Sequence, residues 1–218
     1  MAKCNKAEKE EIIIDYTNML AESVGARAGI TAKQLERIAP RARKAHGAVA
    51  ERRRAGKLPF MDLPYQKYAD DILKYARETR PKFENFVVLG IGGSALGAIA
   101  LQTALNPPFY NLLPAKRRGG PRFFVEDNVD PERIADLLDI VDVKKTLFNV
   151  VTKSGGTAET MSALMIVRDL IARRLGAGAA KKHLVATTDA AKGDLRAIVQ
   201  REGLTSFVVP DGVGGRFS

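Results

Sequence analysis

Small hydroxyl side chains and glycines come together at two places in this sequence. The first is GIGGSALG, residues 90–97, in which Ser94 supplies the hydroxyl. The second is TKSGGTAET, residues 152–160, which contributes Thr152, Lys153, Ser154 and Thr157. Glycine lets the backbone approach a ligand closely, and the peptide N–H groups at a helix start attract an anion. Two such turns favour a phosphate monoester as the ligand.

A third glycine-rich stretch, DGVGGRFS at 211–218, carries a candidate catalytic cation. Gly214 and Gly215 precede Arg216, and an arginine held on such a turn can stabilise negative charge that develops on a substrate oxygen. The spacing alone also fits a solvated arginine in a tail, so both interpretations stay open.

The turn at 90–97 matches three familiar motifs only in part. Gly90, Gly92 and Ala95 fit the relaxed dinucleotide fingerprint, but the acid expected about 20 residues later is missing. Leu96 stands where a nucleophile elbow requires glycine, and the turn lacks the Gly-Lys-Ser/Thr ending of a phosphate P-loop. A tight strand–helix turn without a ligand is a further alternative.

Some of the remaining polar residues have simpler explanations than chemistry. Thr157 precedes a predicted helix and could cap it, which is compatible with phosphate binding, and Glu159 suits the helix dipole. Neither His46 nor His183 has a serine or cysteine partner at a recognisable spacing, and no carboxylate–histidine cluster suggests a metal. We therefore expect no metal and no cofactor.

The three turns follow short apolar runs that alternate with helical patterns from about residue 85 onward. The candidate strands are 86–91, 122–126, 146–151, 183–187 and 206–209, and the candidate helices are 95–105, 131–139, 157–175 and 194–202. Continuous apolar strands indicate burial on both faces, and strand–helix alternation predicts an α/β fold with a five-stranded parallel sheet between helices. The carboxyl ends of such strands meet at one edge, where open α/β sheets bind ligands.

The first third of the chain is predicted to be helical. Apolar residues at helical spacing predict a helix over about 6–23, and Thr31 with Gln34 forms a capping box at the start of another. We expect Pro40 to end or kink that second helix, with a further helix at about 41–55. A loop over 58–65 and a helix over about 66–79 complete this part.

The chain of 218 residues has a formal net charge of +10 at pH 7, which favours anionic partners. The densest basic segment is 33–57, which has no interleaved aromatic residues for base stacking and no DNA-binding signature. We interpret it as a solvated helical face and expect no nucleic-acid partner.

The composition, the lack of long apolar runs and the single cysteine indicate the class of protein and its expected location. Hydrophobic residues make up 45% and charged residues 28% of the chain, as in ordinary globular proteins. No apolar run approaches the roughly 18–20 residues that span a bilayer, and no signal-peptide stretch opens the sequence. Cys4 is the single cysteine, which excludes an internal disulfide framework. We expect a cytoplasmic protein that does not bind membranes.

Four stretches together resemble the glucose-6-phosphate isomerase (phosphoglucose isomerase) family: GIGGSALG, FVEDNVDPERI at 124–134, TKSGGTAET, and VGGRFS at 213–218. The resemblance runs from about residue 85 to the end and only weakly over the helical first third. It implies a flavodoxin-like sugar-isomerase (SIS) domain. It also implies interconversion of glucose 6-phosphate and fructose 6-phosphate through a cis-enediolate, in glycolysis and gluconeogenesis.

The resemblance also implies roles for individual residues. The sugar phosphate would be held by Gly93, Ser94, Thr152, Lys153, Ser154 and Thr157, with Gly215 and Arg216 at the reacting carbons. Arg216 would stabilise the enediolate. The family frequently has serine where this chain has Thr152, and the hydroxyl is kept.

The family's glutamate base, ring-opening histidine and late lysine all lie downstream of its GGR segment. The resemblance therefore implies a fragment, with a helical segment at 1–82 packing on one SIS domain at 83–218 and the second SIS domain absent. We expect this fragment to bind a hexose 6-phosphate without isomerising it, and the full-length form to be a homodimer.

Two other functions stay open. SIS domains also serve non-enzymatic sugar-phosphate sensors with helical DNA-binding parts, which the basic segment 33–57 would suit. A dinucleotide-dependent oxidoreductase is disfavoured by the missing ribose-binding acid.

Overall fold

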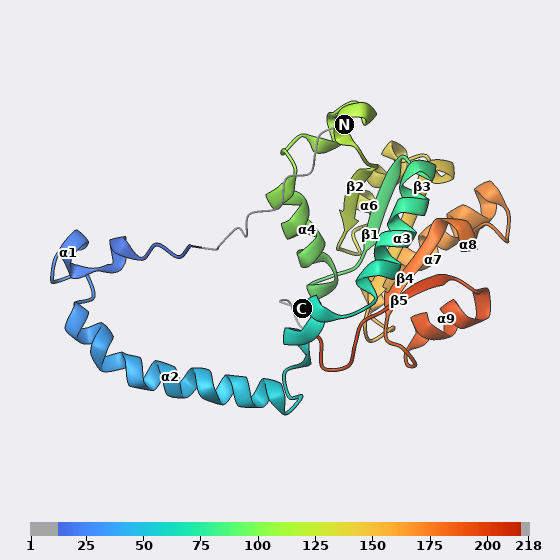
Figure 1. Cartoon of the computed structure of the whole chain (residues 1–218). Helices are drawn as coiled ribbons and strands as arrows, with labels where there is room; N and C mark the ends of the chain where they lie inside the picture. The colour runs from blue at the N-terminus through green and yellow to red at the C-terminus, as the bar shows by residue number, and fades with distance from the viewer. Residues whose placement is uncertain (1–12, 215–218) are drawn as a thin grey trace, which may run out of the picture. The chain divides into compact units, whose positions relative to one another are not determined.

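The structure is a computed structural model of the chain, and it describes residues 13–214 (Figure 1). Two residues expected in the site, Gly215 and Arg216, therefore lie outside the described residues. The chain divides into two compact units, residues 1–57 and residues 58–218.

The described part of the first unit is helical. It contains η1 (Thr17–Met19), α1 (Ala21–Val24) and α2 (Ala32–Arg54). The helix expected over 6–23 is wrong at residues 13–16, which have no regular structure, and at Leu20, which is extended. A backbone bridge between Leu20 and Ile30 holds the chain extended there and separates η1 from α1.

Helix α2 begins as the sequence predicts. The Thr31 hydroxyl accepts a bond from the Gln34 N–H at 3.3 Å, and the Gln34 side chain accepts one from the Thr31 N–H at 2.8 Å. This confirms the capping box. The separate helix at 41–55 is wrong, because α2 runs unbroken through Pro40. The ring removes one backbone hydrogen bond, and water can bond the freed carbonyl because this part of α2 is exposed.

The basic residues within 33–57 lie on α2 or directly after it. Their side chains are exposed apart from the half-buried Arg53. The structure thus has the expected solvated face, and the absence of a nucleic-acid partner stays a prediction.

The second unit opens with short helices that lead to the sheet. They are η2 (Pro59–Tyr65), α3 (Ala69–Thr79) and η3 (Arg80–Lys82). The loop expected over 58–65 is therefore a 3-10 helix for most of its length. The fixed φ of proline near −65° suits a 3-10 helix, so Pro59 and Pro64 do not prevent it.

The sheet confirms the predicted fold class. Its parallel strands are β1 (Asn85–Leu89), β2 (Arg122–Glu126), β3 (Thr146–Thr152), β4 (Leu184–Thr188) and β5 (Thr205–Val208). They lie in the order β2-β1-β3-β4-β5, which is the flavodoxin-like order.

Helices cover both faces of the sheet (Figure 1). The longer ones are α4 (Gly93–Leu105), α6 (Pro131–Ile140), α7 (Ala158–Leu175) and α9 (Asp194–Glu202). The shorter ones are η4 (Tyr110–Leu112), α5 (Ala115–Arg118), η5 (Val143–Lys145) and α8 (Ala180–His183). Helices α6, α7 and α9 pack on one face, while α3 and α4 lie on the other.

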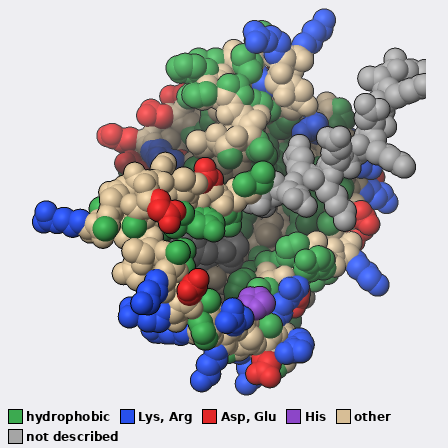
Figure 2. All heavy atoms as spheres, turned by 60° about the vertical axis from the view of Figure 1, so that its left-hand side comes forward, with side chains coloured by type: hydrophobic (Ala, Val, Ile, Leu, Met, Phe, Trp, Pro, Cys, Tyr) green, Lys and Arg blue, Asp and Glu red, His purple; other side chains and the backbone are tan. Residues whose placement is uncertain are grey.

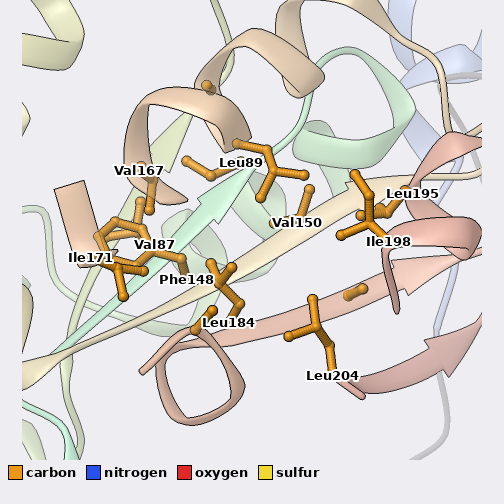
Figure 3. Packing of buried hydrophobic residues seen from close by; sticks show 14 of the residues in the cluster. Val87, Leu89, Phe148, Val150, Val167, Ile171, Leu184, Leu195, Ile198 and Leu204 are labelled. Atoms are coloured by element: carbon orange, nitrogen blue, oxygen red, sulfur yellow. The ribbon is translucent and has the colours of Figure 1, made fainter. Parts of the chain in front are cut away.

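The main core fills the space between the sheet and α6, α7 and α9. Figure 3 shows Val87 and Phe148 of the sheet beside Val167 and Ile171 of α7. These side chains are at most 1% exposed. Because β1 and β3 are buried along most of their length, they form a rigid base for the loops that follow them.

The order of the strands decides where those loops meet. Strand β1 lies between β2 and β3, so the chain leaves β1 toward one side of the sheet and β3 toward the other. Such a switch point leaves a crevice at the carboxyl ends of the two strands. The turn after β1 and the loop after β3 are the two hydroxyl-bearing stretches of the sequence.

Candidate functional site

Three hydroxyl groups form a cluster where β3 ends and α7 begins. The Thr152 Oγ1 atom lies 2.9 Å from Thr157 Oγ1 and 3.3 Å from Ser154 Oγ, and the last two atoms are 3.2 Å apart. The chain brings them together because Thr152 closes the strand and Thr157 stands directly before the helix. Thr152 is buried, Thr157 is half-buried and Ser154 is exposed, so the cluster opens toward solvent.

The Thr157 hydroxyl does not cap α7. Thr157 is the residue before the helix, yet its side chain makes no bond to the N–H groups of the first turn. Its hydroxyl bonds to Thr152 and Ser154 instead. The first backbone N–H groups of α7 have no acceptor within the helix, so they leave the positive end of the helix dipole beside the hydroxyl cluster.

The turn after β1 and the hydroxyl cluster after β3 line one cavity. A cavity of about 550 Å³ is lined by Gly93 and Ser94, by the hydroxyl cluster with Lys153, and by residues of the 208–214 segment. Gly92 also lines it and has φ +58° and ψ −123°, a conformation that only glycine adopts readily. That conformation turns the chain from β1 into α4 and exposes the backbone of the turn to the cavity.

Lys153 connects the second and third glycine-rich stretches. Its Nζ atom donates a hydrogen bond to the Val213 carbonyl oxygen at 2.6 Å. The lysine thus holds the 211–214 turn against the end of β3. An ammonium group has three donors, so this bond leaves two for other acceptors.

The loop after β3 is braced by a residue that the sequence reasoning missed. A Cβ at Gly193 would collide with the Ser154 carbonyl oxygen, so only glycine lets the start of α9 approach this loop. The Leu195 N–H donates to the Gly155 carbonyl at 3.1 Å, which ties the two segments together. The signal was present in the sequence, because Gly193 also lies between a strand and a helix.

Asp189 holds the loop that connects β4 to α9. Its Oδ1 atom accepts bonds from the Ala191 and Lys192 N–H groups at 2.8 and 2.9 Å. These two bonds hold the pKa of Asp189 below its usual range. The carboxylate is therefore committed to the loop's own backbone.

The acids after β2 are also engaged. Glu126 is 3% exposed, and burial raises its pKa although the bond to Arg133 opposes the rise. Arg133 lies 3.2 Å from the Glu126 carboxylate and 3.0 Å from that of Asp127. The Gly90 N–H donates to the Glu126 carbonyl, which fixes the first turn to β2. Glu126 is buried and Asp127 is paired with Arg133, which argues against a ribose-binding acid here and so against a dinucleotide.

The other polar candidates are structural. His183 ends α8 rather than opening β4, and its Nδ1 atom lies 2.9 Å from the Thr146 carbonyl oxygen. Within residues 13–214, no group of His, Cys, Asp and Glu side chains could hold a metal ion. Over the same residues, no helix has both the length and the apolar character needed to cross a membrane.

Comparison with known proteins identifies relatives of the chain. The sequence model of the phosphoglucose isomerase family matches residues 72–218. Glucose-6-phosphate isomerase of Carboxydothermus hydrogenoformans is 51% identical over 173 residues, which are 78% of this chain and 37% of the relative. The enzyme of the same name from Rubrobacter xylanophilus is 42% identical over 210 residues, 95% of this chain and 46% of the relative.

Solved structures agree with these matches. A hypothetical protein from Thermus thermophilus superposes with a TM-score of 0.73 at 40% identity, over 85% of this chain and 42% of that one. Glucose-6-phosphate isomerase from Chlamydia trachomatis gives a TM-score of 0.54 at 29% identity, over 66% of this chain and 26% of that one.

The chain spans less than half the length of these relatives. Within that span the family model covers the whole α/β sheet and both hydroxyl-bearing loops. The chain therefore belongs to the phosphoglucose isomerase family.

Proposed function

We propose that this chain supplies the phosphate-binding half of an aldose–ketose isomerase site for hexose 6-phosphates. The observation that carries the proposal is the cluster of Thr152, Ser154 and Thr157 hydroxyls beside the start of α7. Ser94 lines the same cavity from the neighbouring strand end. Hydroxyls and backbone N–H groups at a helix start are donors suited to a phosphate monoester.

The cluster is suited to exchange its internal bonds for bonds to phosphate. Each hydroxyl is both a donor and an acceptor, and its hydrogen rotates to suit the partner. In the free chain the three groups satisfy one another. When a phosphate dianion occupies the cavity, each hydroxyl can donate to a phosphate oxygen, with Gly93, Ser94 and Lys153 completing the surroundings.

The catalytic part of the proposal rests on the family relationship. Arg216, with Gly215, would lie at the reacting carbons and stabilise the cis-enediolate between glucose 6-phosphate and fructose 6-phosphate. Moving a proton between C1 and C2 needs a base within hydrogen-bond reach. Of the described residues that line the cavity, none is Asp, Glu or His. We therefore expect the 218-residue chain to bind the substrate without isomerising it.

The same proposal covers the whole protein. In this proposal the chain consists of a helical segment at 1–82 and one SIS domain at 83–218. The full-length protein is a cytoplasmic homodimer that works in glycolysis and gluconeogenesis without a cofactor. The relatives named above carry the isomerase name, and this supports the proposal for the reaction.

Calorimetry with glucose 6-phosphate and with glucose tests the phosphate site. The double variant Ser154→Ala with Thr157→Ala should bind glucose 6-phosphate at least about tenfold more weakly, because two charge-assisted bonds are lost. Glucose binding should hardly change. Ser162→Ala is the matched control, since Ser162 is an exposed hydroxyl residue on the same helix.

Two results would count against the proposal. An equal loss for both ligands would show that the hydroxyls do not recognise the phosphate. Turnover by the 218-residue chain in a coupled assay, at the rate of a full-length isomerase, would place the base within these residues.

A further inference from the structure

Helix α9 carries an arginine in an unusual environment. Most of the Lys and Arg side chains visible in Figure 2 extend outward from the surface, whereas Arg196 is only 7% exposed. An arginine is almost never fully buried unless an acid pairs with it. The two hydrogen-bond partners that the described residues give to Arg196 are both neutral.

The guanidinium group of Arg196 bridges two segments of the chain. Its Nε atom donates to the Asp189 carbonyl oxygen at 2.7 Å, and its Nη1 atom donates to the Ser206 hydroxyl at 3.0 Å. Asp189 follows directly after β4, and Ser206 lies on β5. A guanidinium group is planar and holds its donors in a fixed fork. The two bonds therefore set the position of the loop after β4 relative to β5.

The remaining donor atom of Arg196 shows that this arrangement is costly. Its Nη2 atom is buried and has no hydrogen-bond partner among the described residues. Burying a charge with an unpaired donor opposes folding. An apolar side chain of similar length would fill the same space without that cost. The arginine is therefore better explained by what its fork holds in place than by the stability of α9.

The loop held at the Asp189 carbonyl packs on the loop at 152–157. It ends at Gly193, which lies so close to the Ser154 carbonyl oxygen that a Cβ would collide with it. A shift of Asp189 would move this contact. Arg196 thus acts on one wall of the cavity through the backbone between β4 and α9.

The strand held at the Ser206 hydroxyl leads to the opposite wall. Directly after β5, the Val209 N–H donates to the Thr188 carbonyl at 2.9 Å. Val209 and Pro210 line the cavity of about 550 Å³ that also contains the hydroxyl cluster. The chain then enters the stretch that carries Arg216. The position of β5 therefore decides where this stretch begins.

We propose that Arg196 is a positioning residue that sets the spacing between the 152–157 loop and the 208–214 segment. The inference rests on the proposed function, because this spacing matters if a sugar phosphate binds between the two segments. Arg196 does not itself line the cavity. A substitution there should alter binding without removing any group that faces the ligand.

Calorimetry and hydrogen exchange on Arg196→Met test the proposal. Methionine fills irregular space in a core but has no donors. We expect glucose 6-phosphate to bind about tenfold more weakly, as for the loss of one well-aligned bond to phosphate. Amide exchange should become faster at 152–157 and at 208–214, while α6 serves as the unchanged reference.

Val199→Ala is the matched control, because Val199 is a 5% exposed residue of the same helix. It should unfold at a lower urea concentration, since deleting buried methyl groups leaves a cavity. It should nevertheless bind glucose 6-phosphate as the unsubstituted chain does. If Val199→Ala weakens binding as much as Arg196→Met, binding follows the stability of α9 and the proposal is overturned.

Ser206→Ala gives a second test that keeps the guanidinium group and remains available if Arg196→Met does not fold. It removes the bond to β5 and leaves the bond to Asp189. Exchange should therefore become faster at 208–214 but not at 152–157, and this measurement needs no ligand. Unchanged exchange at 208–214 would overturn the proposal.

The double variant Ser154→Ala with Thr157→Ala separates this inference from the proposed function. If it weakens glucose 6-phosphate binding while Arg196→Met does not, the phosphate site stands and the positioning role fails. If the unsubstituted chain binds no glucose 6-phosphate, the proposed function fails, and the role of Arg196 in binding fails with it.

Discussion

Gly193 and Gly176 offer a controlled test of how the loop at 152–157 is held in place. Gly193 has φ +91° and ψ 159°, and Gly176 has φ +95° and ψ 158°, so their backbones are nearly identical. Only their surroundings differ. A Cβ at Gly176 meets nothing within 4 Å, whereas a Cβ at Gly193 runs into the Ser154 carbonyl. Alanine at each position therefore separates backbone strain from the collision.

The expected magnitudes follow from this comparison. This region of φ and ψ is almost exclusive to glycine, and placing another residue there costs on the order of 1–3 kcal/mol. We expect Gly176→Ala to lower the free energy of unfolding by that amount. Gly193→Ala should cost about 1–3 kcal/mol more, because the loop at 152–157 must shift to remove the overlap and overpacking is penalised in that range.

Urea unfolding and calorimetry on the two variants test whether the start of α9 positions the loop at 152–157. Both variants should unfold at lower urea concentration, with Gly193→Ala the less stable. Only Gly193→Ala should also weaken glucose 6-phosphate binding, because Ser154 belongs to the hydroxyl cluster. If both variants lose the same stability and Gly193→Ala binds the sugar phosphate normally, the start of α9 does not position this loop.

Two further predictions concern charged groups near the strand ends. Lys153→Met should speed hydrogen exchange at residues 211–214 and weaken glucose 6-phosphate binding. The bond to the Val213 carbonyl is lost, and a bond from a charged donor is worth about 1.5–3 kcal/mol; unchanged exchange would contradict this. Burial raises the pKa of Glu126 above its ordinary 4.5. The protonated carboxyl therefore stabilises the folded state fully below pH 4.5, and this stabilisation is lost as the pH rises through the raised pKa. Glu126→Gln should remove this decline from unfolding curves measured above pH 4.5, and an unchanged pH profile would refute the assignment.

The sequence predicted the elements that depend on local pattern. All five strands are present with ends within two residues of the prediction, because each is a short apolar run between turn residues. The helix through Pro40 was missed, since proline reduces helix stability but does not forbid a helix whose freed carbonyl is exposed. The break at Leu20 was also missed, because it depends on pairing with Ile30.

The candidate site could likewise be predicted only in part. Residue type and spacing were enough to single out the hydroxyls of Ser154 and Thr157 and the glycines around them. They could not show that the Thr157 hydroxyl turns away from its helix toward Thr152. Nor could they show that Gly193 abuts the Ser154 carbonyl. The first fact depends on the local geometry of the loop between β3 and α7. The second depends on the sheet order, which places β4 beside β3 and so brings the start of α9 to this loop.

The bond between Lys153 and Val213 connects the loop proposed to bind phosphate with the segment that leads to the proposed catalytic Arg216. Lys153 lies within the loop at 152–157, and Val213 lies three residues before Arg216. The loop that would bind phosphate thus also fixes where the chain enters the segment that carries the proposed catalytic arginine. Because the Lys153 ammonium keeps two further donors, a phosphate in the cavity can accept from it while the bond to the Val213 carbonyl is kept. Lys153→Met removes the bond to Val213 and the remaining donors together, so one variant should both loosen residues 211–214 and weaken glucose 6-phosphate binding.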